Sequence, residues 1–289
     1  MELDGSQSIF PLHSELRTRG SLAVGVSYLD KAARFEVAQA LAPAGWCQFG
    51  ASDLKIAAQA WSARAVQERR SAAVFATISA GLTSLPVSLG LLSALARIIV
   101  DELGHADLCR RMAVELGGTV EDDDLGSAER RLRPGGRGST TAALSLLLIE
   151  GAVGETISAA IFAATRAVTA ESRTRSALSA VLRDEVRHAR ICWEALAALA
   201  TEMEPDLSTV ERDLSHEMGV VEIHSVLPAL KRVDAGDLGK PEHAALGILP
   251  PLKRVEVFYS AWEETIIPRL RKLGIDGQRI WAERYKSGA

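Results

Sequence analysis

The chain has few of the residues that mark several common classes of protein. Its three cysteines, Cys47, Cys109 and Cys192, are isolated in the sequence, so neither a disulfide framework nor a paired-cysteine metal site is predicted. Aromatic residues make up only 5% of the 289 residues and the net charge is −4, which together disfavour nucleic-acid binding. The first residues are acidic and lack the order of a secretory signal, so we expect a cytoplasmic protein with reduced thiols.

Charged residues are also absent from 71 to 96, a stretch long enough to cross a bilayer as a helix. Gly81, Thr83, Ser84 and Pro86 interrupt this stretch with residues that favour turns. We therefore expect two helices joined by a turn, with apolar faces buried against other helices and no membrane span.

Apolar residues recur at helical spacing over most of the chain, and strand-like alternation is nearly absent. The sequence therefore predicts an all-α protein. Capping and helix-breaking residues divide its centre into two helical hairpins joined by a long polar crossover at 119–138. The four long helices of this predicted bundle cover 53–81, 86–117, 139–169 and 172–202.

Shorter helical segments flank this centre. One is predicted at 30–41, and two more at 208–220 and 255–273. We expect a single domain over 1–289, with a core at 53–202 and helical extensions at 1–52 and 203–289.

The most informative pattern in the chain is a short motif that occurs twice. Asp101-Glu102-Leu-Gly-His105 lies on the second long helix, and Asp184-Glu185-Val-Arg-His188 lies on the fourth. Residues three apart share one face of a helix, so each copy directs a carboxylate and an imidazole to the same side. Such a pair is suited to binding a metal ion.

The preceding helices carry a second duplication. Glu68-Arg-Arg-Ser-Ala-Ala resembles Glu155-Thr-Ile-Ser-Ala-Ala, at an offset of 87 residues against 83 for the paired motifs. An internal repeat implies repeated structure. The repeat selects Glu155 rather than Glu150 as the counterpart of Glu68. Glu150 and Glu155 are five residues apart, so on an α-helix they would point roughly 140° apart and could not both face the site.

The two repeats combine into one predicted site. Each half supplies a lone carboxylate and a Glu-x-x-His pair, and four buried acids without a cation would be costly. Iron or manganese suits such an oxygen-rich set, and the Asp before each motif would accept a hydrogen bond from the opposite half's histidine. The predicted metal ligands are Glu68, Glu102, His105, Glu155, Glu185 and His188, with Asp101 and Asp184 behind them.

Three other residue types, each represented by two residues, are given structural roles. Cys109 and Cys192 each follow a motif histidine by four residues and are interpreted as small core residues. We expect Trp61 and Trp193 to serve packing. His216 and His224 lie beyond the bundle and are placed on the surface or in the core.

With these residues in place, 53–202 resembles the ferritin-like di-iron carboxylate superfamily. The resemblance implies a four-helix bundle with a long crossover, two iron ions or a manganese–iron pair, and O2 or peroxide chemistry. The Asp-Glu-x-Arg-His form at Asp184 to His188 looks like the oxygenase branches. Val181 stands where the arylamine N-oxygenase branch has an extra histidine, which puts that subfamily in doubt.

Other branches of the superfamily fit less well. The chain has no cysteine-rich iron domain as in rubrerythrins, and none of its three tyrosines lies on the four long helices, which disfavours a stored tyrosyl radical. Its extensions make it longer than a ferritin subunit. We therefore expect a non-haem di-iron oxidase or monooxygenase acting on a small organic substrate, with O2, an external electron donor and possible homodimerisation.

Two other functions stay open at this point. The first is a ferroxidase or iron-storage protein, in which the same site oxidises iron. The second is a structural scaffold with a vestigial site.

Overall fold

The computed structural model describes residues 46–83, 85, 87–119, 139–203 and 207–286. Helices form almost all of this part of the chain, and no strand occurs in it, so the predicted all-α class is confirmed. The predicted helix at 30–41 and nearly all of the crossover at 119–138 lie outside the described residues.

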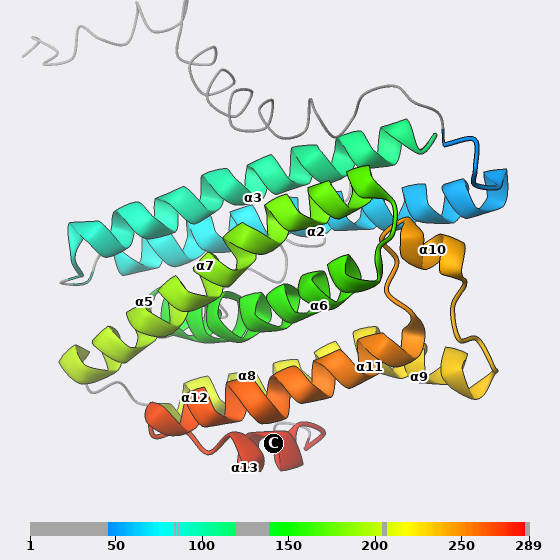
Figure 1. The fold of residues 1–289 in the computed structure, drawn as a ribbon. Helices are drawn as coiled ribbons and strands as arrows, with labels where there is room; N and C mark the ends of the chain where they lie inside the picture. Colours follow the sequence, from blue (N-terminus) through cyan, green and yellow to red (C-terminus); the bar gives the residue numbers. More distant parts are fainter. Residues whose placement is uncertain (1–45, 84, 86, 120–138, 204–206, 287–289) are drawn as a thin grey trace, which may run out of the picture.

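Two long antiparallel helices form the first hairpin, α2 (Ala51–Leu82) and α3 (Leu89–Glu115) (Figure 1). The expected turn between them is present and divides the uncharged stretch. However, α3 begins at Leu89 rather than near residue 86, because Ser88 caps the helix by accepting the Leu91 N–H at 3.1 Å. At its other end Gly117 adopts a φ of 87°, which terminates the helix as predicted.

The second hairpin contains an irregularity that the sequence did not predict. Its first arm is α5 (Ser139–Leu146), a π-helical segment η3 (Leu147–Gly154) and α6 (Glu155–Val168), where a single α-helix was expected. Its second arm is α7 (Ser172–Met203), which packs on α6, η3 and α3. The wider turns of η3 end at Gly154, directly before Glu155.

By length and composition, Ala142–Val168 is also able to cross a membrane. Half of its most apolar window is buried inside the fold. It packs against α7, α2 and the helices that follow α7.

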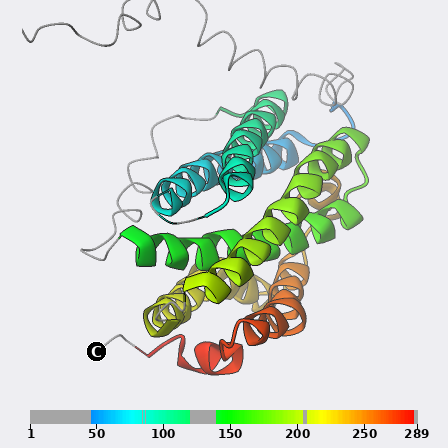
Figure 2. The same cartoon turned by 90° about the vertical axis from the view of Figure 1, so that its left-hand side faces the viewer.

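Most of the remaining helices lie beyond the α5–η3–α6 arm, on the side away from α2 and α3 (Figures 1 and 2). The helices expected at 208–220 and 255–273 are present but longer or interrupted by π-helical turns, and α9, α10 and α13 were not predicted. The bounds are α8 Leu207–Val221, η4 Glu222–Val226, α9 Leu227–Asp234, α10 Pro241–Ala245, α11 Pro251–Ser260, η5 Ala261–Ile266, α12 Ile267–Lys272 and α13 Gly277–Glu283.

Three of these short helices pack against the long helices α2 and α6. α11 and η5 pack on α6, and α10 packs on α2 and α6 near the end of the first hairpin. The core between the long helices is closed by large apolar side chains, including Trp61, Phe75 and Ile78, which are fully buried.

Candidate metal centre

The structure brings all six predicted ligand residues together between the two hairpins. They come from four helices and each is at most 6% exposed. α2 provides Glu68, α3 provides Glu102 and His105, α6 provides Glu155, and α7 provides Glu185 and His188. Helical spacing explains the pairs, because residues three apart on α3 and on α7 face the same way.

The six residues form two groups of four that share two members. Glu68 and His105 belong to the first group, and Glu155 and His188 belong to the second. Glu102 and Glu185 belong to both, and within each group one ligand atom from every residue lies within 4.8 Å of the others. The arrangement can hold a metal ion in each group, with two carboxylates placed between them.

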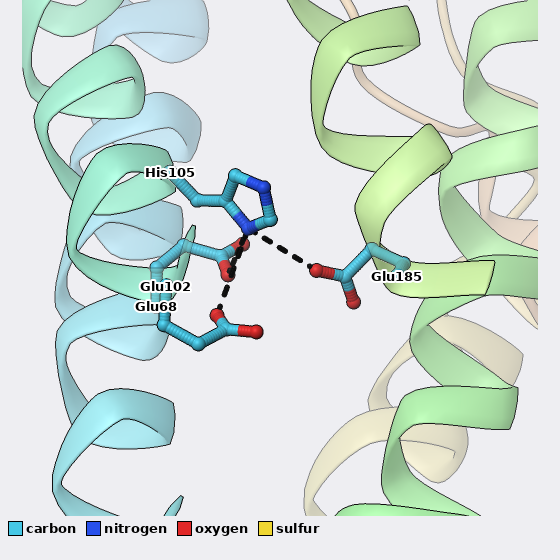
Figure 3. Close-up of side chains that lie close together, drawn as sticks. All are labelled: Glu68, Glu102, His105 and Glu185. Atoms are coloured by element: carbon cyan, nitrogen blue, oxygen red, sulfur yellow. Dashed lines mark ion pairs between the residues drawn. The ribbon is translucent and has the colours of Figure 1, made fainter. Parts of the chain in front are cut away.

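Both imidazoles turn their Nδ1 atoms toward the carboxylates. Nδ1 of His105 lies 3.4 Å from Glu185 Oε1, 3.7 Å from Glu102 Oε2 and 3.8 Å from Glu68 Oε2 (Figure 3). Nδ1 of His188 lies 2.8 Å from Glu102 Oε1, an ion-pair distance without hydrogen-bond geometry. Nδ1 is therefore the atom of each ring that a metal ion would meet.

Several of these inward-facing atoms are buried without a hydrogen bond. In native proteins nearly all buried polar atoms have a partner, so such a concentration of exceptions requires an explanation. A bound cation provides one, because carboxylate oxygens and a neutral imidazole nitrogen are metal ligands. In the cluster, the buried atoms without a hydrogen-bond partner are Glu102 Oε1 and Oε2, His105 Nδ1, Glu155 Oε2, Glu185 Oε1 and His188 Nδ1.

Electrostatics lead to the same interpretation. Burial and the neighbouring Glu185 and Glu102 raise the pKa values of both Glu68 and Glu155 well above the usual range. For Glu102, burial acts in the same direction, but contacts with His105 and His188 outweigh it and lower the pKa to about 2. Ionising all four carboxyls is therefore unfavourable in the cluster by itself, and a pair of cations would neutralise that charge.

The outer nitrogens of the two rings face aspartates on the opposite helix. Nε2 of His105 on α3 lies 3.3 Å from Asp184 Oδ2 on α7, and Nε2 of His188 on α7 lies 3.5 Å from Asp101 Oδ2 on α3. These are the crossed contacts that the sequence led us to expect. They orient each ring with Nδ1 inward. Burial lowers the pKa of His188, but the contacts with Asp101 and Glu102 outweigh it and raise the pKa to about 9.

Arg187 joins the two aspartates, a role that sequence reasoning did not assign. Its Nη2 lies 2.6 Å from Asp101 Oδ2 and 2.8 Å from Asp184 Oδ1. Gly104 occupies the equivalent position of the first repeat, and a Cβ there would have no neighbour within 4 Å. One arginine thus serves both halves, and the difference between Arg187 and Gly104 was the only sequence signal for it.

The choice of Glu155 over Glu150 agrees with where the structure places both side chains. Glu155 lies in the cluster, whereas Glu150 Oε1 pairs with Arg70 Nη2 at 2.6 Å and its side chain is 28% exposed. The angle of roughly 140° expected for an α-helix does not apply here, because Glu150 lies within the π-helical turns of η3 and Glu155 directly follows them. The Arg70 contact holds Glu150 outside the site.

The cysteines, tryptophans and histidines that were given structural roles from the sequence lie outside the six-residue cluster. Cys109 and Cys192 are buried free thiols, and burial raises both of their pKa values. Trp61 is in the core, and Trp193 donates to Thr156 Oγ1 at 2.9 Å. His216 and His224 are exposed on α8 and η4, away from the cluster.

A comparison with protein-family models found no match to this chain, and a search of the curated proteins found none either. The functional argument therefore rests on the geometry of the cluster and on the residues that form it.

Proposed function

We propose that the chain is a ferritin-like di-iron protein, a non-haem oxidase or monooxygenase that uses O2 to oxidise a small organic substrate. The observation that carries the proposal is the pair of four-residue groups that share Glu102 and Glu185. Shared carboxylates between two histidine-capped groups suit two adjacent metal ions.

The donor set favours iron, or iron with manganese. Four carboxylates and two imidazoles form a hard, oxygen-rich site that bears no thiolate, since Cys109 and Cys192 are neutral at ordinary pH. When bound, a pair of ferrous ions would supply electrons for the reduction of O2.

The protein residues perform the remaining tasks. Glu68 and Glu155 each belong to one group only, so each would hold a single metal ion, whereas Glu102 and Glu185 would serve both. Asp101, Asp184 and Arg187 fix both imidazole rings. The burial of all six ligands excludes bulk water from the centre.

The helices after α7 support an enzyme rather than an iron-storage subunit. α8, α11 and η5 cover the outer side of the α5–η3–α6 arm. This side of the bundle is therefore occupied by the chain itself and is not available for packing against other subunits of a storage shell. A monooxygenase would also need an external electron donor, which we include in the proposal.

Metal analysis and O2 consumption test the proposal. The full chain, loaded anaerobically with Fe(II), should bind two irons and consume O2 rapidly on mixing, and crystals should give anomalous peaks at the iron edge within both groups. Many irons per chain in a large shell by light scattering would instead indicate storage. Absence of bound iron and manganese together would refute the metal centre.

A further inference from the structure

Arg64 lies one turn before Glu68 on the same face of α2, the face that carries the first carboxylate of the proposed metal centre. Its guanidinium stacks on the Trp61 ring, with the central carbon 4.7 Å from the ring centroid. Nη2 donates to the Gly247 carbonyl at 2.5 Å, in the loop between α10 and α11. The side chain is therefore held in one position by groups that leave its charge uncompensated.

The other terminal nitrogen of Arg64 has nothing to bind. Nη1 is buried and has no hydrogen-bond partner among the described residues, and no ion pair to Arg64 exists there either. Buried arginines are nearly always paired, because an unpaired charge away from water is costly. Nη1 is thus a charged donor in need of an acceptor.

A second arginine adds to the positive charge at this place. Arg254 of α11 is half-buried, and its guanidinium forms no hydrogen bond or ion pair within the described part of the chain. Burial lowers the pKa of Arg64, and Arg254 lowers it further while Glu68 opposes the change. Arg254 therefore adds to the positive charge around Arg64, and neither guanidinium has an acidic partner among the described residues.

The internal repeat shows that this charge belongs to one half only. At the repeat offset of 87, Arg64 corresponds to Gly151, and Cys109 corresponds to Cys192 at the offset of 83. A Cβ on Gly151 would lie 2.9 Å from Cys192 Sγ, so that half is closed by backbone packing against the thiol. The first half carries an arginine instead, which makes the two ends of the site chemically different.

We propose that Arg64, assisted by Arg254, binds a carboxylate of the substrate and so presents an acidic organic molecule to the end of the metal centre that contains Glu68 and His105. This inference rests on the proposed function, because it assigns a substrate class to the same centre. A guanidinium provides parallel N–H donors that match a carboxylate, and Nη1 is the donor left free for it.

Benzoate and benzamide, which have similar shapes but differ in charge, probe the site. Binding to the full chain is measured by calorimetry with Zn(II), which does not react with O2, in place of iron. We expect benzoate to bind at least 10-fold more tightly than benzamide. Arg64→Gln should weaken benzoate binding by about 10-fold to 100-fold, the range for a lost charge-assisted hydrogen bond, and leave benzamide unchanged.

Two further variants keep the test decisive. Arg254→Gln does not touch the Gly247 loop contact, so it reports on charge even if Arg64→Gln destabilises the fold, and it should weaken benzoate several-fold. Arg110→Gln removes an equal charge from an exposed ion pair with Asp107 on α3 and should change nothing.

The outcomes separate this inference from the function on which it rests. Equal affinity of wild type, Arg64→Gln and Arg254→Gln for benzoate would overturn the inference, even with two metals bound. Arginine-dependent benzoate binding in a chain that takes up no metal would support an acidic-ligand site and reject the di-iron function.

Discussion

Oδ2 of Asp184 on α7 lies 3.3 Å from Nε2 of His105 on α3, so the residue preceding one repeat's glutamate orients the other repeat's histidine. Asp101 and His188 make the reverse contact. Each half of the site is therefore incomplete without the other, and Arg187 ties the two aspartates together.

Asp184→Asn should weaken metal binding by about 10-fold to 100-fold, the usual cost of removing a carboxylate that orients a ligand histidine. The amide keeps the size of the side chain but loses the charge that polarises His105. Competition with a chelator measures the affinity. Asp107→Asn on the exposed side of α3 is the matched control and should bind metal as the wild type does.

Ligands that are shared between the two groups should differ from those that are not. Glu102→Ala removes a member of both groups and should reduce bound iron from two per chain to nearly none. Glu68→Ala affects one group and should leave about one iron per chain, as counted by mass spectrometry of digested protein. Equal losses in the two variants would contradict the shared arrangement.

Glu150→Ala provides the control for this series. Glu150 lies on the same arm as Glu155 but pairs with Arg70 outside the cluster. Its removal should leave two irons bound, whereas Glu155→Ala should remove one. Loss of iron in Glu150→Ala would mean that the π-helical turns of η3 carry Glu150 into the site.

Much of this arrangement could be predicted from the sequence, because its signals are local. Helical spacing and the duplicated Glu68 and Glu155 segments are sufficient to select six residues and to pair them. Arg187 and Arg64 act through contacts with other helices and loops, such as Arg64 with the Gly247 carbonyl, and no periodicity encodes those contacts. Their only trace in the sequence is the difference between the two repeats.

The π-helical turns were missed for a related reason. Leu147–Gly154 is uniformly apolar apart from Glu150, and its composition favours a buried helix without specifying which carbonyl each N–H selects. The short helices α10 and α13 were missed because a few residues give too little periodicity to detect.

Glu222 should make the C-terminal helices sensitive to acid. Burial raises its pKa, but the contacts with Arg284, Tyr285 and Tyr259 outweigh burial and lower it. Tyr259 donates to Oε1 at 2.7 Å, Arg284 Nε donates to Oε2 at 2.5 Å, and Tyr285 also donates to Oε2. The carboxylate therefore joins η4 to α11 and to the chain that follows α13.

A depressed carboxyl pKa contributes stability that is fully present above the unfolded value of about 4.3 and is lost as the pH falls through the folded pKa. Glu222→Gln should lower the free energy of unfolding by about 1.5–3 kcal/mol at pH 7 and by less at pH 3. Urea denaturation at several pH values measures this. Glu256→Gln, in an exposed pair with Lys253, should cost at most about 0.5 kcal/mol at either pH.

The two glycines at Gly104 and Gly151 should respond in opposite directions to the same substitution. A Cβ at Gly104 meets nothing within 4 Å, so Gly104→Ala should stabilise α3 by about 0.5–1 kcal/mol through helix propensity. A Cβ at Gly151 would approach Cys192 Sγ to 2.9 Å, so Gly151→Ala should destabilise the protein by about 1–3 kcal/mol.

A second substitution identifies the cause of the loss at Gly151. Cys192→Ala removes the sulfur, so Gly151→Ala should cost much less in that background, giving a coupling energy of about 1 kcal/mol or more in a double-mutant cycle. Thermal and urea unfolding of the four proteins measure the coupling. Additive effects would show that the backbone of η3, rather than the thiol, rejects a side chain at 151, and the proposed closure of this half by Cys192 would have to be abandoned.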